Sequence, residues 1–172
     1  MILTRHQKFM FDCLKRLGGA SKQQVAALMR PVFCAKYPEY AEHMVETTAT
    51  QLCHCNLRVY WRDGVCFLRG KEPSPALLEA IDIMLELSNN TPLNYWRDDP
   101  PVPLRFQLQS GEKVRMFAVA EYDPAFPQSA FRRTERMIWL FGGRGHPQPL
   151  PVPNKQFLAL RQENGMHRFF TL

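Results

Sequence analysis

Residues 38–55 repeat apolar side chains at intervals of three and four. The recurring positions are Ala41, Met44, Val45, Thr48, Leu52 and Cys55. That period places side chains on one buried face of a helix. The positions between them are polar and predict the solvent-exposed face of the same helix: Glu42, His43, Glu46, Thr47, Thr50, Gln51 and His54.

Two β-rich runs follow this helix directly. Residues 57–61 and 65–69 are rich in β-branched and aromatic side chains, and Asp63-Gly64 lies in the short segment between them. Asp-Gly between two such runs is a strong signal for a tight hairpin turn. The sequence therefore predicts a helix that leads into a two-stranded ribbon.

Two shorter helices are expected before this unit. Thr4 with Gln7, and Ser21 with Gln24, have the spacing of a capping box at a helix start. Gly18-Gly19 should end the first helix, and Pro31 should end the second, shortly after Met29. Three helices and a hairpin over residues 1–70 are the layout of a winged helix-turn-helix domain.

Residues 71–75 are polar and contain two prolines, so the boundary with a second domain, residues 71–172, is expected there. The patterns beyond it predict a small α+β domain around a mixed sheet. The expected elements are a helix over 75–87, a loop over 88–103, a hairpin of 104–108 with 114–120, a glycine-ended central strand over 137–141, a short helix over 153–161 and a last strand over 166–172. The whole chain is therefore assigned to the α+β class.

Composition narrows the class of protein. The chain has 172 residues, of which 45% are hydrophobic and 22% charged, as in ordinary globular proteins. No apolar run approaches the roughly 18 to 20 residues of a membrane span. The first residues do not resemble a secretory signal, so we expect a cytoplasmic protein without membrane contact. The five scattered cysteines are expected to be reduced core thiols.

Charge is unevenly distributed along the chain. The formal net charge is +6, and residues 1–70 carry ten Lys and Arg against five Asp and Glu. The excess of positive charge thus belongs to the predicted winged helix, which favours a polyanion as its partner.

Double-stranded DNA is the partner that this pattern favours, because a winged helix inserts its third helix into the major groove and lays its hairpin along the backbone. Side chains suited to base edges are Thr47, Thr50, Gln51 and His54. Cations placed to contact phosphates are Arg58, Arg62, Arg5 and Lys22. Acidic residues at the start of the third helix leave an alternative open, a protein-interaction or dimerisation module in which Tyr37 and Tyr40 would meet a partner.

Other candidate chemistry is sparse. Glu121 and Asp123, at the end of a predicted strand, have the spacing of a metal-binding pair in Mg²⁺-dependent nucleases, so a metal-dependent nuclease is a second alternative. Neighbouring helix residues point about 100° apart, so Cys53-His54-Cys55 cannot close on one ion. No catalytic residue, metal or cofactor is predicted.

Several short segments carry a family resemblance. Residues 3–7, the Gly-Gly turn and residues 51–58 resemble the winged-helix half of replication-relaxation proteins and related proteins of bacterial mobile elements. The resemblance implies DNA contact around Gln51, Arg58 and Arg62, and a C-terminal domain similar to restriction endonucleases with a carboxylate at Glu121. A partner acid and lysine are missing, which implies a degenerate domain. The expected function is non-enzymatic DNA binding in plasmid or conjugative-element replication or maintenance.

Overall fold

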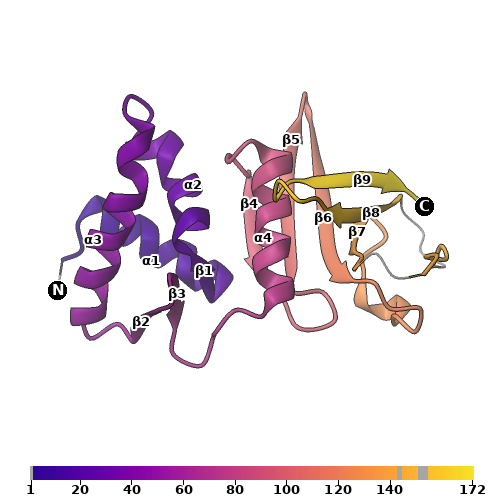
Figure 1. The fold of residues 1–172 in the computed structure, drawn as a ribbon, viewed down its shortest axis with the longest axis horizontal. Coiled ribbons are helices and arrows are strands. Elements are labelled where there is room, and N and C mark those ends of the chain that lie inside the picture. The colour runs from indigo at the N-terminus through magenta and orange to yellow at the C-terminus, as the bar shows by residue number, and fades with distance from the viewer. Residues whose placement is uncertain (1, 143–144, 151–154) are drawn as a thin grey trace.

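The computed structural model describes residues 2–142, 145–150 and 155–172. It is an α+β protein, as the sequence predicts, with two separate sheets (Figure 1). The elements of the first half are α1 (Arg5–Leu17), β1 (Gly19–Ser21), α2 (Lys22–Phe33), the 3-10 turn η1 (Pro38–Tyr40), α3 (Ala41–His54), β2 (Val59–Arg62) and β3 (Val65–Leu68). Those of the second half are α4 (Pro75–Ser88), β4 (Asn94–Arg97), β5 (Leu104–Ser110), β6 (Lys113–Glu121), the 3-10 turn η2 (Gln128–Ala130), β7 (Glu135–Leu140), β8 (Gln156–Arg161) and β9 (His167–Thr171).

Local signals set the starts and stops of the first two helices. The predicted capping boxes of Thr4 with Gln7 and of Ser21 with Gln24 are both present. Gly18 ends α1 with φ of 78°, a left-handed conformation that glycine adopts without strain. These contacts satisfy backbone N–H and C=O groups that helix ends otherwise leave unpaired.

The prediction that Pro31 ends the second helix was wrong. Helix α2 continues to Phe33 with Pro31 inside its last turn. The turn still closes, because the Cys34 N–H donates to the Arg30 carbonyl at 3.0 Å. The Phe33 ring also packs edge-on against Phe9, 5.3 Å between centroids, so tertiary packing offsets the hydrogen bond that proline cannot make.

The predicted hairpin is present, and it belongs to a three-stranded sheet in the order β1-β3-β2. Asp63 and Gly64 form its turn with positive φ angles of 51° and 74°. Strand β1 was not expected, because its three residues are too few for a periodic pattern. It pairs antiparallel with β3, Ala20 opposite Cys66, and fixes the hairpin beside the start of α2.

The second half is a six-stranded mixed sheet in the order β4-β5-β6-β7-β8-β9, with α4 packed on one face. Strands β6, β7 and β8 are parallel to one another, and the remaining pairs are antiparallel. The predicted hairpin, central strand and last strand are β5 with β6, β7 and β9. A smaller core around Trp139 and Phe126 covers the face opposite α4.

Two predictions for the second half were wrong. Part of the loop expected over 88–103 is strand β4, in which Tyr95 pairs with Phe106. The prolines of this segment lie outside the four paired residues, so they do not interrupt the ladder. The short helix expected over 153–161 is instead strand β8 from Gln156 onward, while residues 153 and 154 lie outside the described residues. Pairing with β7 and β9 on both sides overrides its helical propensity.

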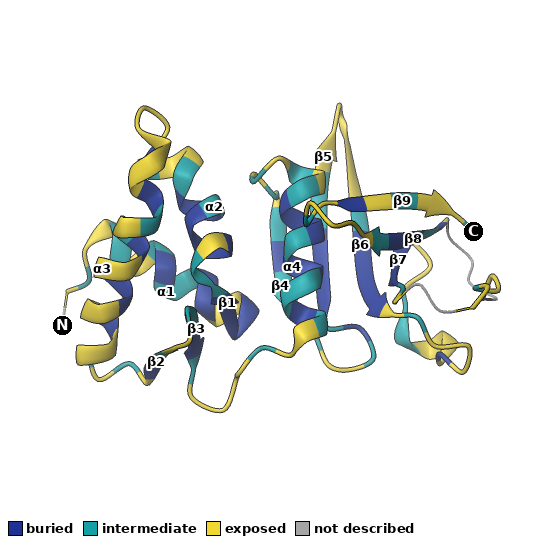
Figure 2. Ribbon diagram, viewed as in Figure 1, coloured by how far each residue is buried: buried dark blue, intermediate teal, exposed yellow. Residues whose placement is uncertain are grey.

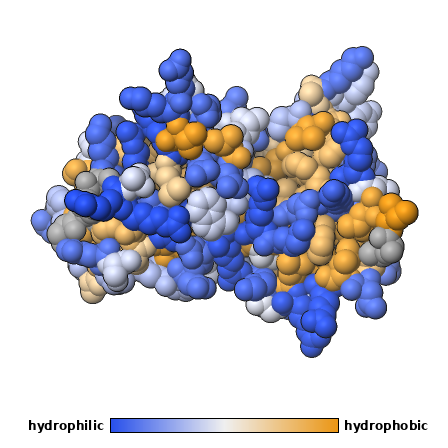
Figure 3. All heavy atoms as spheres, turned by 180° about the vertical axis from the view of Figure 1, so that it is seen from behind, coloured by the Kyte–Doolittle hydropathy of each residue, from blue (hydrophilic) through white to orange (hydrophobic). Residues whose placement is uncertain are grey.

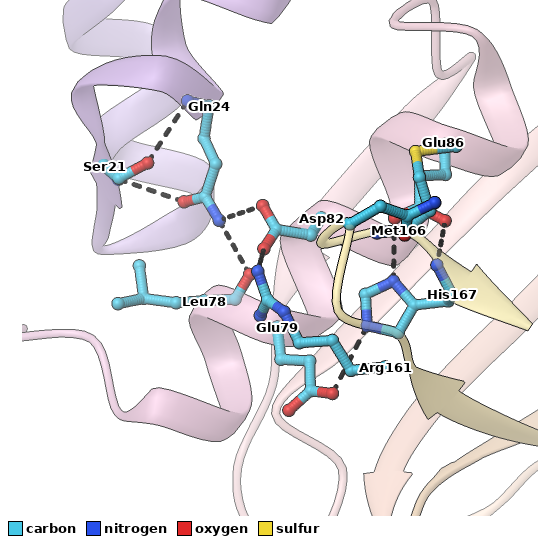
Figure 4. Close-up of polar contacts among 10 residues, drawn as sticks. Ser21, Gln24, Leu78, Glu79, Asp82, Glu86, Arg161, Met166 and His167 are labelled. Carbon is cyan, nitrogen blue, oxygen red and sulfur yellow. Dashed lines mark hydrogen bonds and ion pairs between the residues drawn. The ribbon is translucent and has the colours of Figure 1, made fainter.

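Figure 2 shows buried segments in both halves of the molecule, and these buried residues form one hydrophobic cluster that includes side chains from each half. A polar contact also joins the two halves. The buried side chain of Gln24 on α2 donates to the Leu78 carbonyl at 2.7 Å and to Asp82 at 2.8 Å (Figure 4). Asp82 also pairs with Arg161 at 3.2 Å. The predicted boundary at 71–75 thus falls in an irregular segment between β3 and α4, although the flanking halves share one core. No helix among the described residues is both long and apolar enough to span a membrane.

Candidate nucleic-acid interface

Helix α3 lies at the end of the molecule farthest from the six-stranded sheet (Figure 1), and one face of it is polar and exposed. Its opposite face is buried through Ala41, Val45, Thr48, Ala49 and Leu52. The four side chains predicted to read bases are all exposed, and their spacing of three, one and three residues places them on one face: Thr47, Thr50, Gln51 and His54.

Two of these four side chains already have polar partners. The Thr50 hydroxyl donates to the Glu46 carbonyl at 2.9 Å, which is a local bond within the helix. The Gln51 side chain accepts from Gln7 at 3.0 Å and so links α3 to α1. An amide held in this way keeps its own N–H₂ group available for a base or a phosphate.

A groove of about 770 Å³ lies between the start of α1 and the exposed face of α3. It brings together Arg5, Thr47 and Gln51, three of the predicted contacts from two separate helices. His43 lines the same groove one helical turn before Thr47. His43 was not among the predicted DNA contacts, although the sequence pattern places it on the exposed face of the helix. Its spacing of four residues from Thr47 was the available signal.

Lys22 lies differently from the other predicted phosphate contacts. Its ammonium group is 2.8 Å from a carboxylate oxygen of Glu46 and 3.2 Å from one of Glu42. These hydrogen bonds raise the pKa of Lys22, and the bond to Lys22 lowers the pKa of Glu46. Lys22 therefore offsets part of the negative charge near the start of α3, through a pairing across about twenty residues of chain that sequence periodicity could not reveal.

The hairpin carries the other two predicted cations. Arg58 precedes β2 with a φ of 56°, and Arg62 ends that strand; both are exposed. The Arg62 guanidinium lies over the Phe67 ring, 5.5 Å from its centroid, and 3.9 Å from Glu72. The Lys22 N–H donates to the Gly64 carbonyl at 2.8 Å and so holds the hairpin turn against the start of α2.

Glu121 and Asp123, the predicted acidic pair of the second half, lie in different surroundings. Glu121 lines a cavity of about 370 Å³ with Glu79 and Arg161, where β6 and β8 end against the start of α4. Asp123 instead accepts from the Ala125 N–H at 2.8 Å in an exposed turn. Within the ranges that the structure describes, no group of three or more His, Cys, Asp or Glu side chains could hold a metal ion.

The chain matches no protein-family model, and no curated protein or solved structure matches it. The family resemblance of its short motifs therefore stays a prediction.

Proposed function

We propose that residues 1–70 are a winged helix-turn-helix that binds double-stranded DNA non-covalently and does not cleave or modify it. The binding would serve the replication or maintenance of a plasmid or conjugative element. The order helix, strand, helix, helix and hairpin supports this assignment, as does the sheet order β1-β3-β2. Helix α3 would enter the major groove and the β2-β3 hairpin would follow the backbone.

The observation that carries the proposal is the position of α3. Its polar face is exposed at one end of the molecule. The groove between α1 and α3, called the α3 groove below, lies beside this face, and Arg58 and Arg62 lie on the hairpin that follows. The pairing of Lys22 with Glu42 and Glu46 supports it further, because it reduces the repulsion that free carboxylates would exert on phosphates.

The test measures binding of a fluorescent duplex by anisotropy as a function of salt. We expect the affinity to fall steeply with salt, and Arg58→Glu with Arg62→Glu to weaken binding at least about tenfold and to reduce the log–log slope by about 0.9 for each lost contact. Lys113→Glu with Arg115→Glu is the matched control, since both residues are exposed on the β5-β6 hairpin of the other half. Equal loss in the two double variants would contradict the assignment of the hairpin.

A second candidate function is a protein-interaction module. Tyr37 and Tyr40 favour it, because they are 56% and 57% exposed and pack edge to face with each other beside α3. Self-association that is insensitive to salt and is lost in Tyr37→Ser with Tyr40→Ser, together with no retention of the duplex, would favour this candidate over DNA binding.

A further inference from the structure

A second cavity, of about 390 Å³, lies where α1 and α2 meet the segment before β4. It shares no lining residue with the α3 groove, so the proposed DNA contacts do not account for it. Its volume falls in the range of small-molecule sites, roughly 300 to 1,000 Å³. Its apolar wall is formed by Phe9, Leu28, Pro31, Val32, Pro92 and Tyr95.

Part of this wall is exposed to water. Val32 is 53% exposed although it lines the cavity, and exposed apolar residues also gather in patches over both halves on the reverse face of the molecule (Figure 3). Two polar side chains of the lining, Cys13 and Tyr95, are uncharged. The Tyr95 hydroxyl lies 3.1 Å from the Cys13 sulfur, and burial raises the pKa of the Cys13 thiol to about 11.

The cavity lining includes one cation, Arg16, which forms no ion pair among the described residues. The Arg16 guanidinium lies 5.4 Å from the Tyr95 ring centroid, and its Nη1 donates to the Asn94 side chain at 3.2 Å. No carboxylate of the described chain lies within 4.0 Å of it. The acidic residue of the lining, Asp12, pairs instead with Lys15 at 2.6 Å.

We infer that this cavity binds a small aromatic carboxylate. The ring of the ligand lies against the apolar wall that includes Phe9 and Tyr95, and its carboxylate accepts hydrogen bonds from Arg16. A guanidinium group offers five N–H donors, and among the described side chains only the Nη1 group has an acceptor, Asn94. The other N–H groups are free to form a pair of parallel hydrogen bonds to a planar carboxylate. Binding covers apolar surface that is now wet and joins α1 and α2 to the segment before β4.

The test uses 2-naphthoate as the probe and the uncharged 2-naphthylmethanol as its matched neutral analogue, titrated calorimetrically into the full chain. We expect 2-naphthoate to bind more tightly, and Arg16→Gln to weaken it at least about tenfold without affecting the alcohol. Lys8→Gln is the matched control, because it removes the same charge from an exposed position of α1 outside the cavity. This variant should leave both affinities unchanged.

A second variant tests the place of binding. Val32→Trp fills the mouth of the cavity from an exposed position, so the fold should persist, as circular dichroism would show. Both probes should then lose affinity. The inference is overturned if the wild-type chain does not bind 2-naphthoate, if the neutral analogue binds equally well, or if Arg16→Gln or Val32→Trp leaves 2-naphthoate binding unchanged.

Discussion

Lys22 shows how the role of one residue depends on contacts that sequence cannot display. The sequence predicts it as a phosphate contact, because it is a cation at the start of the second helix. Its ammonium group is instead held between Glu42 and Glu46 of α3. If DNA approaches α3, its phosphates compete with the two carboxylates for this ammonium. The main effect of Lys22 is therefore to reduce the negative charge of α3.

We predict that the Glu46 carboxyl titrates below the usual glutamate range, because the bond to Lys22 stabilises its charged form. A lowered folded-state pKa contributes stability that is present above the unfolded pKa, roughly 4.3, and is lost as pH falls through the folded pKa. Side-chain carbon NMR on a pH series measures this directly.

Lys22→Gln should move the pKa of Glu46 back up, whereas Lys15→Gln should not, since Lys15 pairs with Asp12. The interpretation fails if Glu46 titrates at the same pH in the wild-type chain and in Lys22→Gln.

The helices and strands that were predicted correctly are those that local sequence signals define. The capping residues Thr4 and Ser21, and the Asp63-Gly64 turn, act over a few residues, and the elements they start or join are where they were expected. Strands β4 and β8 are fixed by pairing with β5 and with β7 and β9, and not by a clear alternating pattern of their own, and neither was predicted. Periodicity likewise found the exposed face of α3, but the convergence of Arg5 and Gln51 on one groove required the fold.

A buried ion pair joins elements within the second half. The Arg105 side chain on β5 is 6% exposed, and its Nε lies 2.7 Å from Glu135 at the start of β7, a side chain that is fully buried. Arg105 also contacts Asp98 and donates to the Ala130 carbonyl at 2.5 Å. Such a cluster contributes little net stability, but the loss of Glu135 leaves the buried Nε of Arg105 without its acceptor, while Asp98 still pairs with the guanidinium.

Glu135→Ala should therefore lower the free energy of unfolding by about 2 to 3 kcal/mol, as measured by urea denaturation. Glu112→Ala, which removes an exposed carboxylate from the β5-β6 turn, is the control and should cost less than about 0.5 kcal/mol. A change within about 1 kcal/mol for Glu135→Ala would argue against a structural role for this pair.

At the scale of the whole molecule, the two halves meet through a junction that is apolar at its centre and fully hydrogen-bonded at Gln24. Both side-chain N–H groups of Gln24 are used, by Leu78 and Asp82, and its oxygen accepts from the Ser21 N–H at 3.0 Å. The residue that caps α2 thus also ties α2 to α4. Two domains were predicted from the polar, proline-rich segment at 71–75, but composition of a linker does not tell how much surface its flanking units bury against each other.

We predict that the two halves unfold together, because they share a core. Gln24→Leu removes the hydrogen bonds to Leu78 and Asp82 and leaves the Ser21 N–H without its acceptor, which should cost about 2 kcal/mol. Gln23→Leu, at the exposed neighbouring position, is the matched control and should cost less than about 0.5 kcal/mol. Hydrogen exchange of backbone amides should show faster opening in Gln24→Leu not only in α2 but equally in β6 and β7, which do not contact the altered side chain. If the amides of β6 and β7 exchange as in the wild-type chain while those of α2 accelerate, the halves open independently, and the division at 71–75 is then a boundary of folding as well as of sequence.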